Sequence, residues 1–219
     1  MTGVKTGEPM IDLYTWGTPN GRKVSVMLEE LGLDYNVHEV DISKGQQHEP
    51  QFLEISPNNR IPGIVDSEGP GGEAIKMFET GAILIYLAEK TKSELYPTDP
   101  RKRAVTLQWL MWQMGGVGPM FGQAHHFMFN PAEDVPYAKE RYHNETKRLY
   151  KVMNTRLGEA KHLGGDDYTI ADIATYPWVQ RYNRHQVDLA EFPNVKRWYD
   201  EISKRPTVKK GMAVPFYNE

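Results

Sequence analysis

The sequence predicts an α+β fold, with a mixed domain over residues 10–91 and an all-α domain over residues 100–206. Strand and helix patterns alternate over the first ninety residues, whereas beyond Arg101 the apolar residues repeat only at helical spacing. The segment between them, from Lys92 to Pro100, is polar and contains two prolines, which is typical of a domain linker. A length of 219 residues allows one large domain or two small ones, at about 150 residues per domain.

The spacing of apolar residues predicts the elements of the mixed domain in turn. A short strand is expected from Ile11, where apolar and more polar residues alternate through Tyr14. The segment Gly17–Gly21 is a dense cluster of turn residues. After it, apolar side chains at i, i+3, i+4 and i+7 predict an amphipathic helix over 24–31 that ends at Gly32. Further strands are predicted near 35–40, 61–65 and 74–77 and a helix over 80–90, so the order is β-α-β, a loop or short helix, then β-β-α.

The all-α domain is predicted from repeated apolar helical faces. Such faces occur in three segments, 149–157, 170–177 and 195–202. Thr169 and Asp172 have the spacing of a capping box, in which the threonine hydroxyl accepts from a backbone N–H and the acid reaches back. Beyond Pro206 we expect a loosely ordered tail.

One long stretch, from Ala104 to Ala132, contains no charged residue and at first resembles a membrane span. Polar side chains and the run Gly115–Pro119 interrupt it, so the stretch is too polar and too broken to cross a bilayer. We expect a buried helix that bends at this run, which lacks the Lys-Ser/Thr pair of a phosphate-binding loop. The first ten residues contain no apolar signal-peptide core, so we expect a cytoplasmic protein with no membrane partner.

Charge and cysteine content exclude several classes of function. The 26 Lys and Arg against 29 Asp and Glu give a net charge of −3, which argues against a nucleic-acid partner. There is no cysteine, so the chain can form no disulfide, no thiolate zinc site and no cysteine nucleophile. His125 and His126 are neighbours about 100° apart on a helix and cannot easily share one ion, so no metal is expected. Any thiol chemistry must therefore use a sulfur that a ligand brings.

The turn Gly17–Gly21 is the first candidate site, because it joins a strand to the start of a helix. Helix N-termini expose unpaired N–H groups and stabilise anions, including thiolates. Thr18 offers a hydroxyl there and Asn20 offers an amide donor. The alternative is ordinary helix capping, for which Thr and Asn are common.

Two further segments add complementary chemistry. In Ser56–Pro62, a cis bond before Pro62 would turn the Ile61 backbone outward to pair with an extended peptide; the alternative is an ordinary trans-proline loop. At the start of the next helix, Glu79 can bind an ammonium and Thr80 a carboxylate; the alternative is again a helix cap. Taken together, the three sites suit a short thiol peptide with a free α-amino-carboxylate, which describes glutathione.

The chain resembles the cytosolic glutathione transferase family over nearly its whole length. In that family a thioredoxin-like domain precedes an all-α domain. The segment SPNNRIP resembles the family's cis-Pro loop, FETGAILIYLAEK the helix that binds the γ-glutamyl group, and YTIADIA the capping box of the second domain. The nu class is similar in five segments: TPNG, KGQQ, SPNN, LQWLMWQMGGVGPMFGQAHHF and PYAKERY. Bacterial members of that class are glutathione-dependent disulfide-bond oxidoreductases, and the resemblance also implies a homodimer.

The resemblance implies roles for individual residues. Thr18 and Asn20 would be catalytic and face the glutathione sulfur. Gln47 would touch the glycyl end or a second glutathione, although the neighbouring Gln46 competes with it. The remaining implied contacts are the Ile61 backbone with the cysteinyl unit, Glu79 and Thr80 with the γ-glutamyl end, and Arg141 with a carboxylate.

The expected activity follows from the same turn. Thioredoxin-type reductases place Cys-x-x-Cys where this chain has Thr18–Gly21, so two glutathione molecules would have to supply both sulfurs. Tyr14, the other hydroxyl nearby, alternates away from the turn and is interpreted as strand packing. Two alternatives remain open: conjugation of glutathione to electrophiles, and glutathione binding without catalysis.

Overall fold

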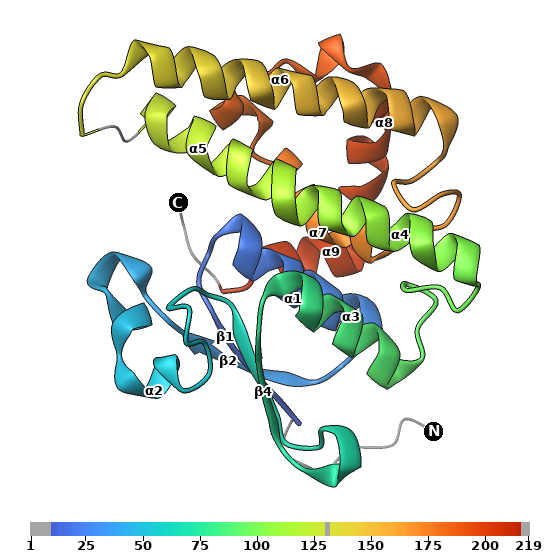
Figure 1. The fold of residues 1–219 in the computed structure, drawn as a ribbon. Helices are drawn as coiled ribbons and strands as arrows, with labels where there is room; N and C mark the ends of the chain where they lie inside the picture. The colour runs from blue at the N-terminus through green and yellow to red at the C-terminus, as the bar shows by residue number, and fades with distance from the viewer. Residues whose placement is uncertain (1–9, 130–131, 216–219) are drawn as a thin grey trace.

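The computed structural model describes residues 10–129 and 132–215, whose arrangement is shown in Figure 1. The N-terminal part forms a four-stranded mixed sheet in the order β2-β1-β3-β4, in which only β1 and β2 pair in parallel. Its strands are β1 (Ile11–Thr15), β2 (Tyr35–Glu39), β3 (Gly63–Asp66) and β4 (Ile75–Phe78). Two helices, α1 (Pro19–Leu31) and α3 (Thr80–Thr91), lie between this sheet and the helical part (Figure 1). The predicted order of elements and the α+β class are confirmed.

Helix α1 ends at Gly32, as expected, and begins at Pro19 within the turn cluster, ahead of Val24, where its predicted apolar face starts. Thr18 is the N-cap, and its side chain accepts a hydrogen bond from the Gly21 backbone N–H. Pro19 occupies the first helical position, where its missing N–H costs nothing. The helix ends at Gly32, whose φ of 63° is a left-handed conformation that glycine adopts readily. These signals place the start of α1 directly after β1.

The connection from β2 to β3 consists of short helical turns. They are the 3₁₀ turns η1 (Ile42–Lys44) and η2 (Gln46–His48), followed by the single-turn helix α2 (Pro50–Leu53). A further 3₁₀ turn, η3 (Pro70–Gly72), joins β3 to β4. The Ile61–Pro62 peptide bond just before β3 is cis, as the resemblance of this segment to the family's cis-Pro loop implied; the alternative of a trans-proline loop was wrong.

The C-terminal part is helical among the residues that the structure describes. It contains α4 (Pro100–Trp112), α5 (Gly118–Phe129), α6 (Pro136–Glu159), α7 (Ile170–Val179), α8 (Pro193–Ile202) and α9 (Pro206–Met212), with short 3₁₀ turns η5 (Tyr182–His185) and η6 (Leu189–Glu191). The segment η4 (Gln113–Val117) is one turn of π-helix between α4 and α5. π-turns bend helices, so the glycine-rich run acts within a helix and is not a phosphate-binding loop. The division into domains at 91 and 100 stays a prediction.

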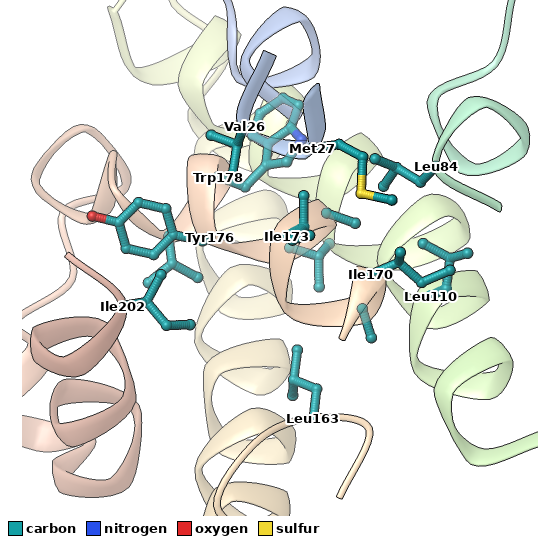
Figure 2. Packing of buried hydrophobic residues seen from close by; sticks show 14 of the residues in the cluster. Val26, Met27, Leu84, Leu110, Leu163, Ile170, Ile173, Tyr176, Trp178 and Ile202 are labelled. Carbon is teal, nitrogen blue, oxygen red and sulfur yellow. The ribbon is translucent and has the colours of Figure 1, made fainter. Parts of the chain in front are cut away.

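One apolar core joins the two parts, and α7 lies at its centre. Every residue of α7 is buried. Figure 2 shows Ile170 and Ile173 of α7 near Leu110 of α4, with Met27 of α1 and Leu84 of α3 close by. Because the same core touches α1 and α3, the helical part supports the helices that flank the sheet.

The predicted capping box at the start of α7 is present. The Thr169 hydroxyl accepts from the Ala171 backbone N–H at 3.3 Å, and Asp172 accepts from the Thr169 backbone N–H at 3.0 Å. The buried Asp172 carboxylate also accepts from the Leu163 backbone N–H at 2.9 Å and from Trp198 Nε1 at 2.8 Å. It therefore ties α7 to α8 as well as capping its own helix.

The expectation of a loosely ordered tail beyond Pro206 was wrong, because α9 packs against α1. The Ser25 hydroxyl donates to the Gly211 carbonyl at 2.7 Å. Arg205 holds the Glu30 carboxylate through two hydrogen bonds of 2.8 and 2.7 Å. Thr207 donates to the same carboxylate at 2.6 Å. These contacts involve residues nearly the whole chain apart, which no local pattern predicts.

Most of the uncharged stretch that resembled a membrane span lies in α4, η4 and α5. Within residues 10–129 and 132–215, no helix combines the length and apolar character needed to cross a bilayer.

Candidate functional site

A cavity of about 270 Å³ lies where the start of α1, the loop before β3 and the start of α3 converge. We call it the α1–α3 cavity. Its lining residues are Asn20, Asn58, Arg60, Ile61, Pro62, Phe78, Glu79 and Thr80. Four residues predicted from sequence are therefore brought together at one cavity, close to the lower end of the usual volume of small-molecule sites, about 300–1,000 Å³.

Thr18 is not among the lining residues, although it stands two residues before Asn20. Its hydroxyl oxygen accepts from the Gly21 backbone N–H at 3.2 Å, so the capping role considered from sequence is real. A hydroxyl that accepts still has a proton to donate. Capping and donation to a ligand sulfur are therefore compatible at this residue.

The helical part holds the turn from behind. Trp178 of α7 donates through Nε1 to the Asn20 side-chain oxygen at 3.1 Å. Just after α7, Arg181 donates to the Gly17 carbonyl at 3.3 Å. With its oxygen engaged, the Asn20 amide keeps its NH₂ group as a donor, and Asn20 lines the cavity.

The cis-proline loop contributes backbone groups. Among the described residues, no backbone partner hydrogen-bonds to Ile61, which directly precedes Pro62. The loop is held in place by the Ser56 hydroxyl, which donates to the Arg60 carbonyl at 2.8 Å. The Ile61 N–H and C=O can therefore pair with an extended ligand, as β-addition requires.

The start of α3 has an unusual backbone. Glu79, the residue before the helix, has a φ of 68°, a value that non-glycine residues avoid and that costs of order 1–3 kcal/mol. Its side chain is exposed, whereas Thr80 is 7% exposed. The conformation puts a free carboxylate beside the unpaired N–H groups of a helix N-terminus, so cationic and anionic ligand groups can bind side by side.

Sequence reasoning missed Lys23, which lies behind Thr80. Its side chain is buried, and Nζ donates to Gln113 Oε1 at 2.9 Å and to the Thr80 hydroxyl at 3.4 Å. Burial lowers the pKa of its ammonium from 10.5 to about 7, although the negative charge of Glu79 opposes this shift. The sequence did contain one indication that Lys23 is buried: it lies four residues before the buried Met27, on the apolar side of α1.

The two adjacent glutamines in η2 have different environments. Gln46 Oε1 accepts from the Asp41 backbone N–H at 2.7 Å and so supports the loop. Gln47 Oε1 is buried and has no hydrogen-bond partner among the described residues. Neither residue lines the α1–α3 cavity. Gln46 is thus engaged within its own loop, and the contact of Gln47 with a ligand stays a prediction.

Arg141 is not brought to the α1–α3 cavity. It lies on α6 in a separate hollow of about 660 Å³ between α5 and α6, lined by Met120, Tyr137, Glu140, Arg141, Tyr142, Asn144, Glu145 and Arg148. Tyr14 lies on the sheet, where its ring stacks on His38 with centroids 4.5 Å apart. In the described part of the chain, no three His, Cys, Asp or Glu residues form a group that could hold a metal ion.

Comparison with known families adds to this geometry. Residues 9–89 match the model "Glutathione S-transferase, N-terminal domain", and residues 117–206 match "Glutathione S-transferase, C-terminal domain". The chain belongs to the glutathione S-transferase family. The sequence-based recognition of this family is confirmed.

Individual members of the glutathione S-transferase family are similar over almost the full chain. The disulfide-bond oxidoreductase YfcG of Escherichia coli is 53% identical over 204 residues, covering 93% of this chain and 94% of that protein. A family member from Pseudomonas fluorescens, solved with two glutathione bound, has a TM-score of 0.91 and 44% identity, covering 97% of this chain and 96% of that one. One from Pseudomonas putida, solved with one glutathione disulfide per subunit, has a TM-score of 0.90 and 45% identity, covering 97% and 94%.

Proposed function

We propose that this chain is a glutathione-dependent disulfide-bond oxidoreductase that uses the thiolate of bound glutathione. The observation that carries the proposal is the convergence of Asn20, Ile61, Glu79 and Thr80 on one cavity at two helix N-termini. A protein without cysteine must take the sulfur for thiol–disulfide exchange from its ligand. The names of the similar oxidoreductase and of the glutathione-bound structures support the same activity.

The proposed binding mode follows the chemistry of the cavity walls. The Ile61 backbone pairs with the cysteinyl unit of glutathione, which places its sulfur near the turn before α1. Asn20 donates through its NH₂ group and Thr18 through its hydroxyl to that sulfur, and α1 adds the positive end of its dipole. Glu79 binds the α-ammonium and Thr80 the α-carboxylate of the γ-glutamyl group.

The reaction proceeds by two thiol–disulfide exchanges. The bound glutathione thiolate attacks one sulfur of the substrate disulfide, forming a mixed disulfide as the S–S bond of the substrate breaks and a substrate thiolate leaves. A second glutathione thiolate attacks the glutathione sulfur of the mixed disulfide and releases the second substrate thiolate. The products are oxidised glutathione and two substrate thiols, with water supplying their protons. Two electrons pass from two glutathione molecules to the substrate.

Three further features belong to the same proposal. Gln47 contacts the glycyl end or the second glutathione, because the neighbouring Gln46 is engaged with the Asp41 backbone. Arg141 binds a glutathione carboxylate, and its distance from the α1–α3 cavity fits a homodimer in which surfaces of two chains meet. A reductase that consumes reduced glutathione also fits the reducing conditions of the cytoplasm.

The experiment is reduction of a small symmetrical disulfide by glutathione, followed as formation of oxidised glutathione. Thr18→Ala is expected to lower kcat at least tenfold while the Kd for glutathione changes less than threefold. Thr18→Ser, which keeps both the cap and the donor, serves as the matched control and is expected to stay within threefold of the wild type.

The competing functions give different results in the same assay. Fast conjugation of an electrophilic aromatic compound without disulfide turnover would identify a conjugating transferase. Tight glutathione binding with neither reaction would identify a binding protein. Equal losses of kcat and of affinity in Thr18→Ala would refute a role for the hydroxyl in activating the sulfur.

A further inference from the structure

We propose that Lys23 is a positioning residue that orients the Thr80 hydroxyl as a donor toward the α-carboxylate of glutathione. The inference rests on the proposed function, because it concerns the γ-glutamyl end of the same site. It adds a residue that does not touch the ligand and that lies behind the wall of the α1–α3 cavity.

The geometry isolates Lys23 from water and points its amine at the cavity wall. The side chain comes from the second turn of α1 and is 2% exposed. Nζ meets three atoms from two other elements: the Thr80 hydroxyl at 3.4 Å, Gln113 Oε1 at 2.9 Å and Met114 Sδ at 3.9 Å. Gln113 and Met114 belong to the π-turn η4, so this turn closes the pocket around the amine.

The hydrogen-bond chemistry of Thr80 gives the contact a direction. Its hydroxyl oxygen accepts from Lys23, and a hydroxyl has only one proton to donate. That proton has Met114 Sδ as its protein acceptor, at 3.4 Å, and a thioether is a weak acceptor. A carboxylate in the cavity is a much stronger acceptor than a thioether. The Thr80 hydroxyl can therefore turn its O–H toward the ligand and donate a hydrogen bond to it, and only the weak bond to Met114 is lost.

The charges around Lys23 favour this arrangement when the ligand binds. Glu79, beside Thr80, is the acidic group whose charge acts on the ammonium, and η4 contributes no charged side chain. On α7 the acidic residue is Asp172, whose oxygens bind the start of its own helix and Trp198. On α9, Lys209 and Lys210 are exposed. A ligand carboxylate therefore adds a negative charge to a site where burial alone disfavours the ammonium.

A purely structural explanation of Lys23 is weaker. A buried ammonium destabilises a fold relative to an apolar side chain of similar length, so methionine would fill the space at lower cost. A lysine at this position is explained if its ammonium orients the Thr80 hydroxyl toward the ligand.

The test is calorimetric titration of the whole protein at pH 7 with two ligands. One is S-methylglutathione, which has no thiol to ionise. The other is the same compound with 4-aminobutanoyl in place of γ-glutamyl, so that only the α-carboxylate is missing. In Lys23→Met, affinity for S-methylglutathione is expected to fall about tenfold or more, as for a hydrogen bond to a charged group. Affinity for the second ligand is expected to change less than twofold.

A double-mutant cycle shows whether Lys23 acts through the hydroxyl. In a Thr80→Val background, Lys23→Met is expected to cost less than a further twofold. Met114→Leu is the matched control, because it replaces the competing acceptor at similar volume and should leave affinity unchanged or raised. Lys23→Gln provides a second variant of the same site, with an uncharged donor.

The outcomes separate the role of Lys23 from the glutathione site itself. Equal losses for both ligands in Lys23→Met, no loss for either, or full additivity with Thr80→Val would overturn the role of Lys23 while leaving the glutathione site intact. Failure of the wild type to bind S-methylglutathione would overturn the proposed function and this inference with it.

Discussion

Replacing Lys23 by methionine is expected to change the stability of the protein in a pH-dependent way. The pKa of this ammonium is near 10.5 in the unfolded chain and about 7 in the fold, because the folded site is buried. Between these values the unfolded state binds the proton and the folded state does not, so the free energy of unfolding of the wild type rises with pH. A methionine has no proton to lose, so the variant lacks this component.

The magnitude follows from the two pKa values. Each pH unit between them changes the free energy of unfolding by about 1.4 kcal/mol. The stability advantage of Lys23→Met over the wild type should therefore be greatest below pH 7 and should shrink by about 2 kcal/mol between pH 7, where the folded ammonium is half titrated, and pH 9. The lost hydrogen bond to Gln113 offsets part of the advantage by roughly 1–3 kcal/mol.

The measurement is urea unfolding of both proteins at pH 7 and pH 9, followed by tryptophan fluorescence at one protein concentration. The alkaline condition is safe because the chain has no cysteine to oxidise. The exposed Lys151→Met is the control and should differ from the wild type by the same amount at both pH values. A difference between Lys23→Met and the wild type that stays constant from pH 7 to pH 9 would refute the reasoning.

Three further variants test other contacts. Trp178→Phe removes the donor that holds the Asn20 oxygen, and disulfide turnover of the folded variant should fall about tenfold, with a loss of about 1–2 kcal/mol of stability from the smaller buried ring; unchanged turnover would contradict a role for amide orientation. Glu79→Gly relieves a φ of 68° and should keep or raise the unfolding free energy by about 1 kcal/mol, while glutathione affinity measured by calorimetry falls more than tenfold; loss of stability would contradict the strain. Gly211→Ala places a Cβ 2.5 Å from Val26 Cα and should cost about 1–3 kcal/mol in urea unfolding, whereas a neutral result would show that α9 can move away.

Local patterns predicted most of the fold because its helices bury one face and end at recognisable caps. The boundaries of α1 follow from Thr18, Pro19 and Gly32, and the start of α7 follows from its capping box. The helix α9 was missed because it is short and polar, with Val208 and Gly211 as its buried residues. Its stability comes from its contacts with α1, and the spacing of residues within one segment cannot predict a contact with a distant segment.

In the candidate site, too, local sequence patterns predict some residues and miss those whose roles depend on distant segments. Asn20, Ile61, Glu79 and Thr80 follow turns or begin helices, so sequence reasoning could find them. Lys23 could not be assigned in this way, because its environment depends on Gln113, 90 positions later. Likewise, the two adjacent glutamines differ in the fold, where the Gln46 oxygen accepts from the Asp41 backbone N–H. Charges and amides acquire their roles from tertiary neighbours rather than from their own segment.

The packing of α9 on α1 has a consequence for biosynthesis. Glu30 leaves the ribosome early, whereas Arg205, its partner, is made 175 residues later. At about 5–20 residues per second, Arg205 is made roughly 10–35 s after Glu30, and α1 lacks this contact during that time. The contacts between Glu30 and the segment that begins α9 therefore form only after residues 205–207 have been made. A nascent chain or a degradation fragment that stops before residue 206 would carry every residue of the α1–α3 cavity without the helix that braces it.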